Sequence, residues 1–180
     1  GLFGVHYSEK TKDTFKKFVG CDYVNTFLVY NDDYFSKEAT ECFNLIANAK
    51  KTCFLYFYQL AFERVDGQGI VDVGESFAEG PETVLKKGWR ENFVKLKDGL
   101  KDKPFYEAID GFYIDEPFLC GVALDDFEEV TRFLTALFGK RIYVCFSVAG
   151  VAPDIWTMDG VPVINEKAGR FITDAGFDMY

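Results

Sequence analysis

Residues 109–122 read IDGFYIDEPFLCGV, and this stretch poses the questions of both fold and function. An apolar, aromatic run leads into two adjacent acids, Asp115 and Glu116, and Pro117 then ends the run. Near-continuous apolar runs of this kind are typical of strands in a parallel sheet that is covered by helices. Burying an ionised carboxylate is costly unless it is paired. The two acids are therefore either a solvated strand end or residues held there for chemistry.

The rest of the chain repeats this pattern, because apolar runs of strand length alternate with segments of helical periodicity. Strands are predicted at residues 2–7, 23–31, 52–62, within 109–122, at 141–150 and from 176 onward. Helices are predicted from Thr11 to Gly20, at 36–50, over Val84, Leu85, Trp89, Phe93 and Leu96, from Asp125 to Gly139, and at 165–175. Asp125 and Glu128 have the spacing of a capping box, and Gly139 is placed to end that helix.

Two architectures fit such an alternation, a (β/α)8 TIM barrel or a doubly wound parallel sheet. The first strand–helix turn, VHYSEKTKD, has no glycine fingerprint for a dinucleotide, and the glycines of DGQGIVDVG (66–74) have the wrong spacing. A complete barrel takes roughly 250 residues. We therefore predict one (β/α) barrel-type domain over residues 1–180, incomplete with about six strands, and keep the doubly wound sheet as the alternative. The chain is expected to be an N-terminal portion of a barrel.

The charge balance argues against nucleic acid and anionic membranes as partners. The chain has 20 basic and 29 acidic residues, a net charge of −9, and no dense cluster of Lys and Arg. Its longest apolar runs are strand-sized, well below the roughly 20 residues of a membrane span. The absence of a signal peptide from a chain that starts at Gly1 leaves the compartment open between cytoplasmic and secreted.

The five cysteines are odd in number and scattered, and no CxxC pair occurs. One histidine is available to help them bind a metal. We interpret them as reduced, packed thiols and predict neither a metal site nor a cofactor.

Candidate site residues gather where the predicted strands end, since the carboxyl ends of parallel strands carry the function in both architectures. Besides Asp115 and Glu116, the candidates are His6, Tyr30, Asn31, Gln59, Trp156, Asp178 and Tyr180. Carboxylates, amides and aromatic rings suit a neutral polyhydroxylated ligand better than a phosphate, because rings stack on sugar faces and carboxylates accept hydrogen bonds from hydroxyls.

Each candidate also has a purely structural interpretation. Asp115 and Glu116 can be a solvated strand end beside a helix N-terminus. His6 is as well suited to a structural hydrogen bond as to a ligand contact. Trp156 can anchor its Pro- and Gly-containing loop instead of stacking on a sugar.

The strand that ends in Asp115–Glu116–Pro117 resembles the strand-four signature of TIM-barrel glycoside hydrolases. Retaining enzymes of the large barrel clan end this strand in Asn-Glu-Pro, and here Asp115 takes the place of the Asn. The barrel hexosaminidases of families 20 and 123 carry an adjacent Asp-Glu pair, in which the Asp orients the acetamido group of the substrate and the Glu protonates the leaving oxygen. The resemblance implies that Glu116 is the general acid/base and Asp115 its partner.

The resemblance makes a glycoside hydrolase that acts on a neutral or N-acetylated sugar the first functional hypothesis. Cleavage needs a carboxyl that is still protonated near neutral pH, through desolvation or a nearby negative charge. A non-catalytic carbohydrate-binding or scaffold barrel is the alternative. A doubly wound domain that binds a small molecule at its switch point is the third hypothesis.

Overall fold

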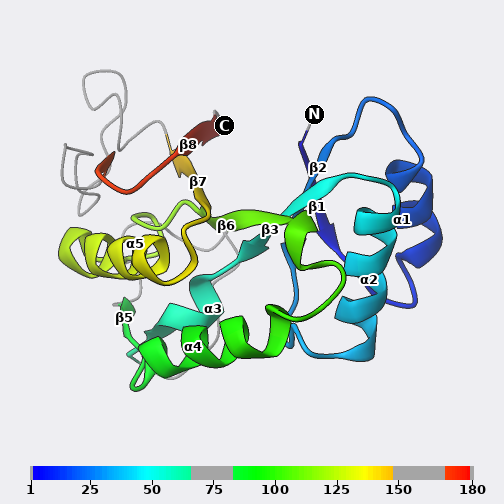
Figure 1. The fold of residues 1–180 in the computed structure, drawn as a ribbon. Helices are drawn as coiled ribbons and strands as arrows, with labels where there is room; N and C mark the ends of the chain where they lie inside the picture. Colours follow the sequence, from blue (N-terminus) through cyan, green and yellow to red (C-terminus); the bar gives the residue numbers. More distant parts are fainter. Residues whose placement is uncertain (1, 66–82, 148–168, 179–180) are drawn as a thin grey trace. The chain divides into compact units, whose positions relative to one another are not determined.

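The computed structural model describes residues 2–65, 83–147 and 169–178, and the chain forms two compact units. Unit 1 consists of Gly1–Tyr56 and Val94–Tyr113, and unit 2 of Phe57–Phe93 and Ile114–Tyr180. Figure 1 follows the elements of both units along the chain.

Unit 1 is built on parallel strands. They are β1 (Leu2–His6), β2 (Thr26–Tyr30), β3 (Thr52–Tyr56) and most of β6 (Ile109–Asp115). The helical elements are α1 (Lys12–Val19), α2 (Lys37–Asn48), the 3-10 turn η2 (Tyr106–Ala108) and the second half of α4 (Trp89–Leu100). The side chain of Ser36 caps α2 by accepting a hydrogen bond of 3.0 Å from Ala39 N.

The helices of unit 1 bury one face of its strands. Along β2, Phe27 and Val29 are fully buried, whereas Thr26, Leu28 and Tyr30 on the other face are half-buried. The Phe15 ring of α1 packs on the Phe27 ring at a centroid distance of 5.1 Å. The α1 and α2 helices lie next to each other in Figure 1. Alternation of side chains along a strand therefore leaves Tyr30 on the face away from Phe27.

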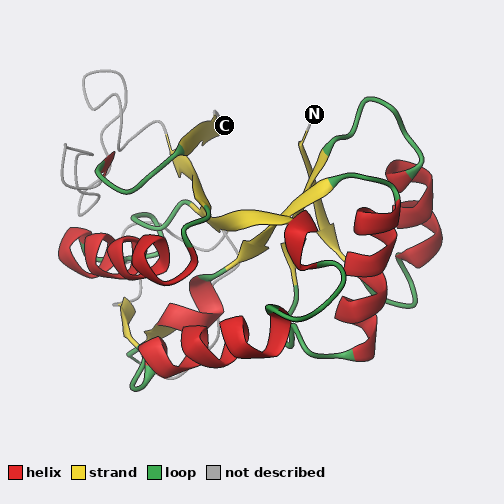
Figure 2. Ribbon diagram, in the orientation of Figure 1, coloured by secondary structure: helices red, strands yellow, loops and turns green. Residues whose placement is uncertain are grey.

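Unit 2 mixes a small hairpin with parallel strands and helices. It contains α3 (Tyr58–Ala61), β4 (Phe62–Arg64), β5 (Thr83–Leu85), the first half of α4, α5 (Leu124–Phe138), β7 (Arg141–Ser147) and β8 (Asp174–Asp178). The β4 and β5 strands pair in an antiparallel two-stranded sheet, and β7 and β8 pair in parallel (Figure 2).

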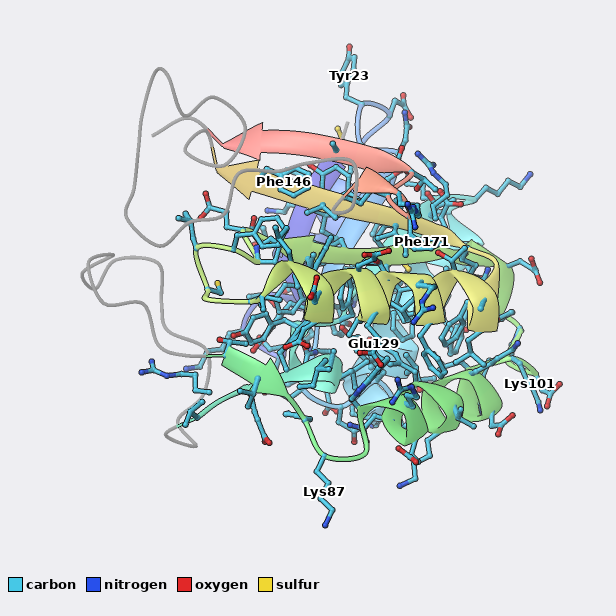
Figure 3. The ribbon with its side chains drawn as sticks, turned by 90° about the vertical axis from the view of Figure 1, so that its left-hand side faces the viewer. Tyr23, Lys87, Lys101, Glu129, Phe146 and Phe171 are labelled. Atoms are coloured by element: carbon cyan, nitrogen blue, oxygen red, sulfur yellow. The ribbon has the colours of Figure 1, made fainter. Side chains whose placement is uncertain are left out.

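Aromatic contacts join α4 to α5 within unit 2. The Trp89 ring lies edge-on to the Phe133 ring at a centroid distance of 5.1 Å. The Arg90 guanidinium lies 4.4 Å from the centroid of the Trp89 ring and pairs with the Glu129 carboxylate, which lies between the two helices in Figure 3. Exposed ion pairs contribute at most about 1 kcal/mol, so the packing of the two rings supplies most of this contact.

The sheet order is β1-β2-β3-β6-β7-β8, which follows the order of the strands along the chain. The β1/β2, β2/β3, β3/β6 and β7/β8 pairs are parallel. The prediction of an α/β fold with a parallel sheet is confirmed. Among the described strands, β1 and β8 lie at the two ends of this order, so no closed barrel is present.

Several predicted boundaries were wrong. The run 52–62 is one strand only to Tyr56, because α3 and β4 follow it. Leu85 belongs to β5 and not to the helix, which begins at Trp89. The last strand starts at Asp174, within the segment 165–175 that was expected to be helical. Apolar content alone does not separate a short buried helix from a strand, which explains these errors.

The helix α5 ends as predicted but begins differently. Gly139 has a φ of 63°, the left-handed conformation that glycine adopts at helix ends without steric cost. The N-cap is Ala123, which has no side chain able to cap, so the predicted capping box of Asp125 and Glu128 is wrong.

Candidate functional site

Glu116 is the candidate with the most unusual local structure. It directly follows β6 and has a φ of 38°, a left-handed conformation that is disfavoured for residues other than glycine. It is also 2% exposed. The backbone N–H of Glu116 donates to the carbonyl of Cys145 on β7 at 2.8 Å, so main-chain bonding holds the strained residue in place.

The turn that follows Glu116 is fixed by its own hydrogen bonds. Cys120 N donates to the Glu116 carbonyl at 3.1 Å, and Val122 N donates to the Pro117 carbonyl at 3.0 Å. The Phe118 ring of this turn packs against Phe127 of α5 and Phe146 of β7, at centroid distances of 5.3 and 6.1 Å. Figure 3 shows Phe146 on β7. The apolar half of the turn therefore fixes the backbone that carries Glu116.

Two hydroxyl groups brace this turn from α3 and β5. Thr83 Oγ1 donates to the Cys120 carbonyl at 2.5 Å. Since this bond uses the only hydroxyl hydrogen of Thr83, Tyr58 is the donor in the 2.9 Å contact between the two hydroxyls. Burial raises the pKa of the Tyr58 phenol, so the phenol is protonated and able to donate. Tyr58 and Thr83 therefore act as positioning residues for the turn.

The Cys120 thiol lies close to both acids of the strand end. Burial raises the pKa of Cys120 to about 12, and the negative charges of Asp115 and Glu116 raise it in the same direction. A thiol with this pKa stays protonated at neutral pH and is a poor nucleophile. The strand end therefore does not support nucleophilic chemistry by Cys120.

Gln59 is a further described candidate of unit 2. It lies in α3, next to Tyr58, and its carbonyl accepts a hydrogen bond of 2.6 Å from Lys86 Nζ. Its main chain thus ties α3 to the segment after β5. Asp178 ends β8, where it is in register with Ser147 of β7, and its side chain is not described.

The remaining described candidates lie in unit 1. His6 and Tyr30 end β1 and β2 and are register partners, although the His6 side chain is not described. The Tyr30 hydroxyl donates to Asp32 Oδ1 at 3.3 Å. Asn31 is 8% exposed, and its Oδ1 accepts a hydrogen bond of 3.0 Å from Asp33 N. This bond gives Asn31 a role in shaping the loop after β2.

Trp156 and Tyr180 lie outside the described residues. In the part of the chain that the structure describes, no three His, Cys, Asp or Glu side chains are grouped as metal ligands. The helices within the same part are all too short or too polar to span a bilayer.

Sequence reasoning missed Tyr58, Thr83 and Cys120. Tyr58 and Thr83 are separated by 25 positions in the chain, and no sequence motif joins them. Their one visible signal is indirect, since Tyr58 lies within the apolar run that was predicted as a single long strand. Recognising that the run breaks after Tyr56 would have placed Tyr58 near a strand end.

Comparisons with known proteins give a distant structural neighbour. No family model and no curated protein matches the chain. A structure of a Rhizobium etli pyruvate carboxylase variant with the allosteric activator acetyl coenzyme A is similar to this chain, with a TM-score of 0.55 and 12% sequence identity. The match covers 97% of this chain and 15% of that chain. At this identity the likeness concerns the fold.

The glycoside hydrolase hypothesis is wrong. The structural neighbour is a carboxylase, which conflicts with an assignment as hydrolase or glycosidase, and no family or curated match supports that assignment. The alternative of a non-catalytic carbohydrate-binding barrel has no support from the comparisons either. The physical reason is that Asp115–Glu116–Pro117 is a short motif. Two acids after a buried strand serve any reaction that needs proton transfer, so they do not specify a glycosidic bond.

Proposed function

We propose that this chain is an enzyme domain that moves protons to and from a small organic molecule, with Glu116 as the general acid/base. The observation that carries the proposal is the backbone of Glu116, a buried, ionisable residue with a φ of 38°. Such strain costs about 1–3 kcal/mol and persists where the surrounding structure imposes it, which happens most often at functional sites. An ordinary solvated strand end would have no backbone strain, and its carboxyl would stay in water at no desolvation cost.

The surroundings of Glu116 suit a proton-transfer role. Asp115 places a second carboxylate next to Glu116 in the chain, at the end of β6. The Tyr58–Thr83 pair and the packed Phe118 ring keep the turn in one conformation. A fixed carboxyl loses less entropy when it meets its substrate, which is the main benefit of a preorganised site.

A small 2-oxo acid is the first substrate class to test. The structural neighbour is named for pyruvate, and its likeness guides only the choice of assay. Burial raises the pKa of the Tyr58 phenol, and the positive charge of Arg64 lies close enough to oppose this shift in part. A guanidinium in the same unit is suited to pairing with the carboxylate of such a substrate.

The proposed step is enolisation. The Glu116 carboxylate takes a proton from the carbon next to the keto group, and the electron pair of the broken C–H bond forms the C=C bond. The keto oxygen then carries the negative charge. Reversal returns a proton from the Glu116 carboxyl to the same carbon. In D₂O the proposal requires the proton on the Glu116 carboxyl to exchange with solvent before the reversal. The carbon then receives a deuteron, so the reaction is visible without any net turnover.

The test follows the methyl signal of pyruvate by proton NMR in D₂O. The wild-type chain is expected to speed the loss of this signal over buffer, and Glu116→Gln to slow the exchange about 100-fold or more. Glu91→Gln is the control, since Glu91 is an exposed residue of α4 in the same unit. No acceleration by the wild-type chain would reject the substrate class. Equal rates in the wild type and a folded Glu116→Gln variant would reject Glu116 as the acid/base.

We also propose that the sheet belongs to a (β/α) barrel-type arrangement. A doubly wound sheet reverses its strand order at a switch point. The order β1-β2-β3-β6-β7-β8 follows the chain without such a reversal, which supports a barrel-type winding. The single domain over residues 1–180 stays a prediction. The expected partners also stay predictions: a carbohydrate ligand is expected, and nucleic acid and membranes are not.

A further inference from the structure

We propose that unit 1 carries a binding site for a small organic cation, formed by Tyr30, Tyr56 and Tyr113 together with Asp32. We call these three side chains the tyrosine row. All four residues belong to unit 1.

The tyrosine row follows from the register of three parallel strands. Tyr56 of β3 is the register partner of Tyr113 of β6. Tyr30 of β2 lies level with Tyr56, since Val29 and Leu55 immediately before them are partners. Side chains at one level of a sheet project to the same face. The ring centroids confirm this, at 5.2 Å between Tyr30 and Tyr56 and 5.0 Å between Tyr56 and Tyr113.

The exposure of the row differs between its members. Tyr56 is 6% exposed, and its carbonyl accepts a hydrogen bond of 2.6 Å from the Tyr34 hydroxyl, so the central residue is firmly held. Tyr30 and Tyr113 on either side are half-buried. The outer two rings therefore present part of their surface to a ligand while the central ring fixes their spacing.

Ring geometry favours a compact cation over a flat molecule. Neighbouring rings are inclined to each other by 50° and 48°, so one planar ligand cannot stack on two of them. An ammonium group needs only to lie within about 6 Å of a ring centroid. Because neighbouring centroids are 5.0 to 5.2 Å apart, a single cation can satisfy this distance for two rings at once.

Charge favours a cation as well. Aromatic ring faces are electrostatically negative. The exposed Asp32 carboxylate accepts the Tyr30 hydroxyl hydrogen bond and so adds a formal negative charge at one end of the row. Burial raises the pKa of Tyr30, and the charge of Asp32 raises it further, so the phenol stays neutral and keeps donating. A quaternary or primary ammonium group complements both features.

Choline and its uncharged isostere 3,3-dimethyl-1-butanol provide a matched pair of probes. Titration of the full chain, followed by calorimetry or by NMR of the tyrosine rings, is expected to give at least ~10-fold tighter binding of choline. Equal affinities for the two probes, or no binding of either at millimolar concentration, would overturn the proposal.

Variants locate the site. Tyr113→Leu is expected to weaken choline binding about fivefold or more, whereas Tyr113→Phe keeps the ring and should stay within about twofold of the wild type. Asp32→Asn is expected to weaken choline binding about threefold without changing the affinity for the alcohol. Tyr30→Leu serves as the second ring variant if Tyr113→Leu does not fold. Wild-type affinity in a folded ring variant would place choline elsewhere.

Discussion

At the scale of single residues, Glu116 combines burial with a backbone conformation that costs free energy. Glycine adopts positive φ angles freely, whereas a Cβ makes them unfavourable by about 1–2 kcal/mol. Glu116→Gly is therefore predicted to be more stable than Glu116→Ala by about 1 kcal/mol, although both lack the carboxyl. Urea unfolding of the two variants measures this difference. An Ala variant as stable as the Gly variant would show that the backbone at 116 is not strained.

Cys120 reports on the carboxylates beside it. Because its pKa is raised to about 12, we expect iodoacetamide to alkylate Cys120 at pH 8 at least ~100-fold more slowly than a free thiol. Glu116→Gln removes a nearby negative charge, which lowers the thiol pKa and should speed labelling about threefold. Peptide mapping by mass spectrometry identifies the labelled residue. Glu91→Gln is the control. If Cys120 is labelled at the same rate in Glu116→Gln as in Glu91→Gln, the Glu116 carboxylate does not raise the pKa of the thiol.

At the scale of elements, Gly99 lets α4 meet the loop after β2. A Cβ on Gly99 would lie 2.3 Å from a ring carbon of Phe35, which is too close for both to stay in place. In a helix, however, Ala is favoured over Gly by about 1 kcal/mol. We predict that Gly99→Ala stabilises the Phe35→Ala variant by about 1 kcal/mol more than it stabilises the wild type.

The double-mutant cycle of Phe35 and Gly99 is measured by chemical denaturation of the wild type, both single variants and the double variant. Phe35 is 53% exposed, so its ring has room to swing away and the coupling is expected to be modest. Free energies that add within about 0.3 kcal/mol would mean that the ring does not restrict position 99.

At the scale of the whole molecule, the sequence predicted the alternation of strands and helices because apolar runs and helical periodicity are local signals. It predicted the acids at the end of β6 for the same reason. The φ of Glu116 could not be predicted, since the hydrogen bond from its backbone N–H goes to Cys145, which lies in a distant part of the chain. The Tyr58–Thr83 brace and the tyrosine row likewise depend on pairing between distant segments.

The functional assignment from sequence failed at this scale too. A strand that ends in Asp115–Glu116–Pro117 has many structural contexts, and the comparison with a carboxylase contradicted the hydrolase assignment. The proposal that Glu116 transfers protons does not depend on a family assignment, because it is argued from the burial and the backbone conformation of this residue.

The rate of hydrogen exchange at the methyl group of pyruvate tests that chemistry most directly, when the wild-type chain and Glu116→Gln are compared at one pH in D₂O. If Glu116 transfers the proton, the wild type exchanges faster than buffer and the variant at least ~100-fold more slowly than the wild type. Equal rates for the two proteins, both shown to be folded by circular dichroism, would contradict the assignment of Glu116.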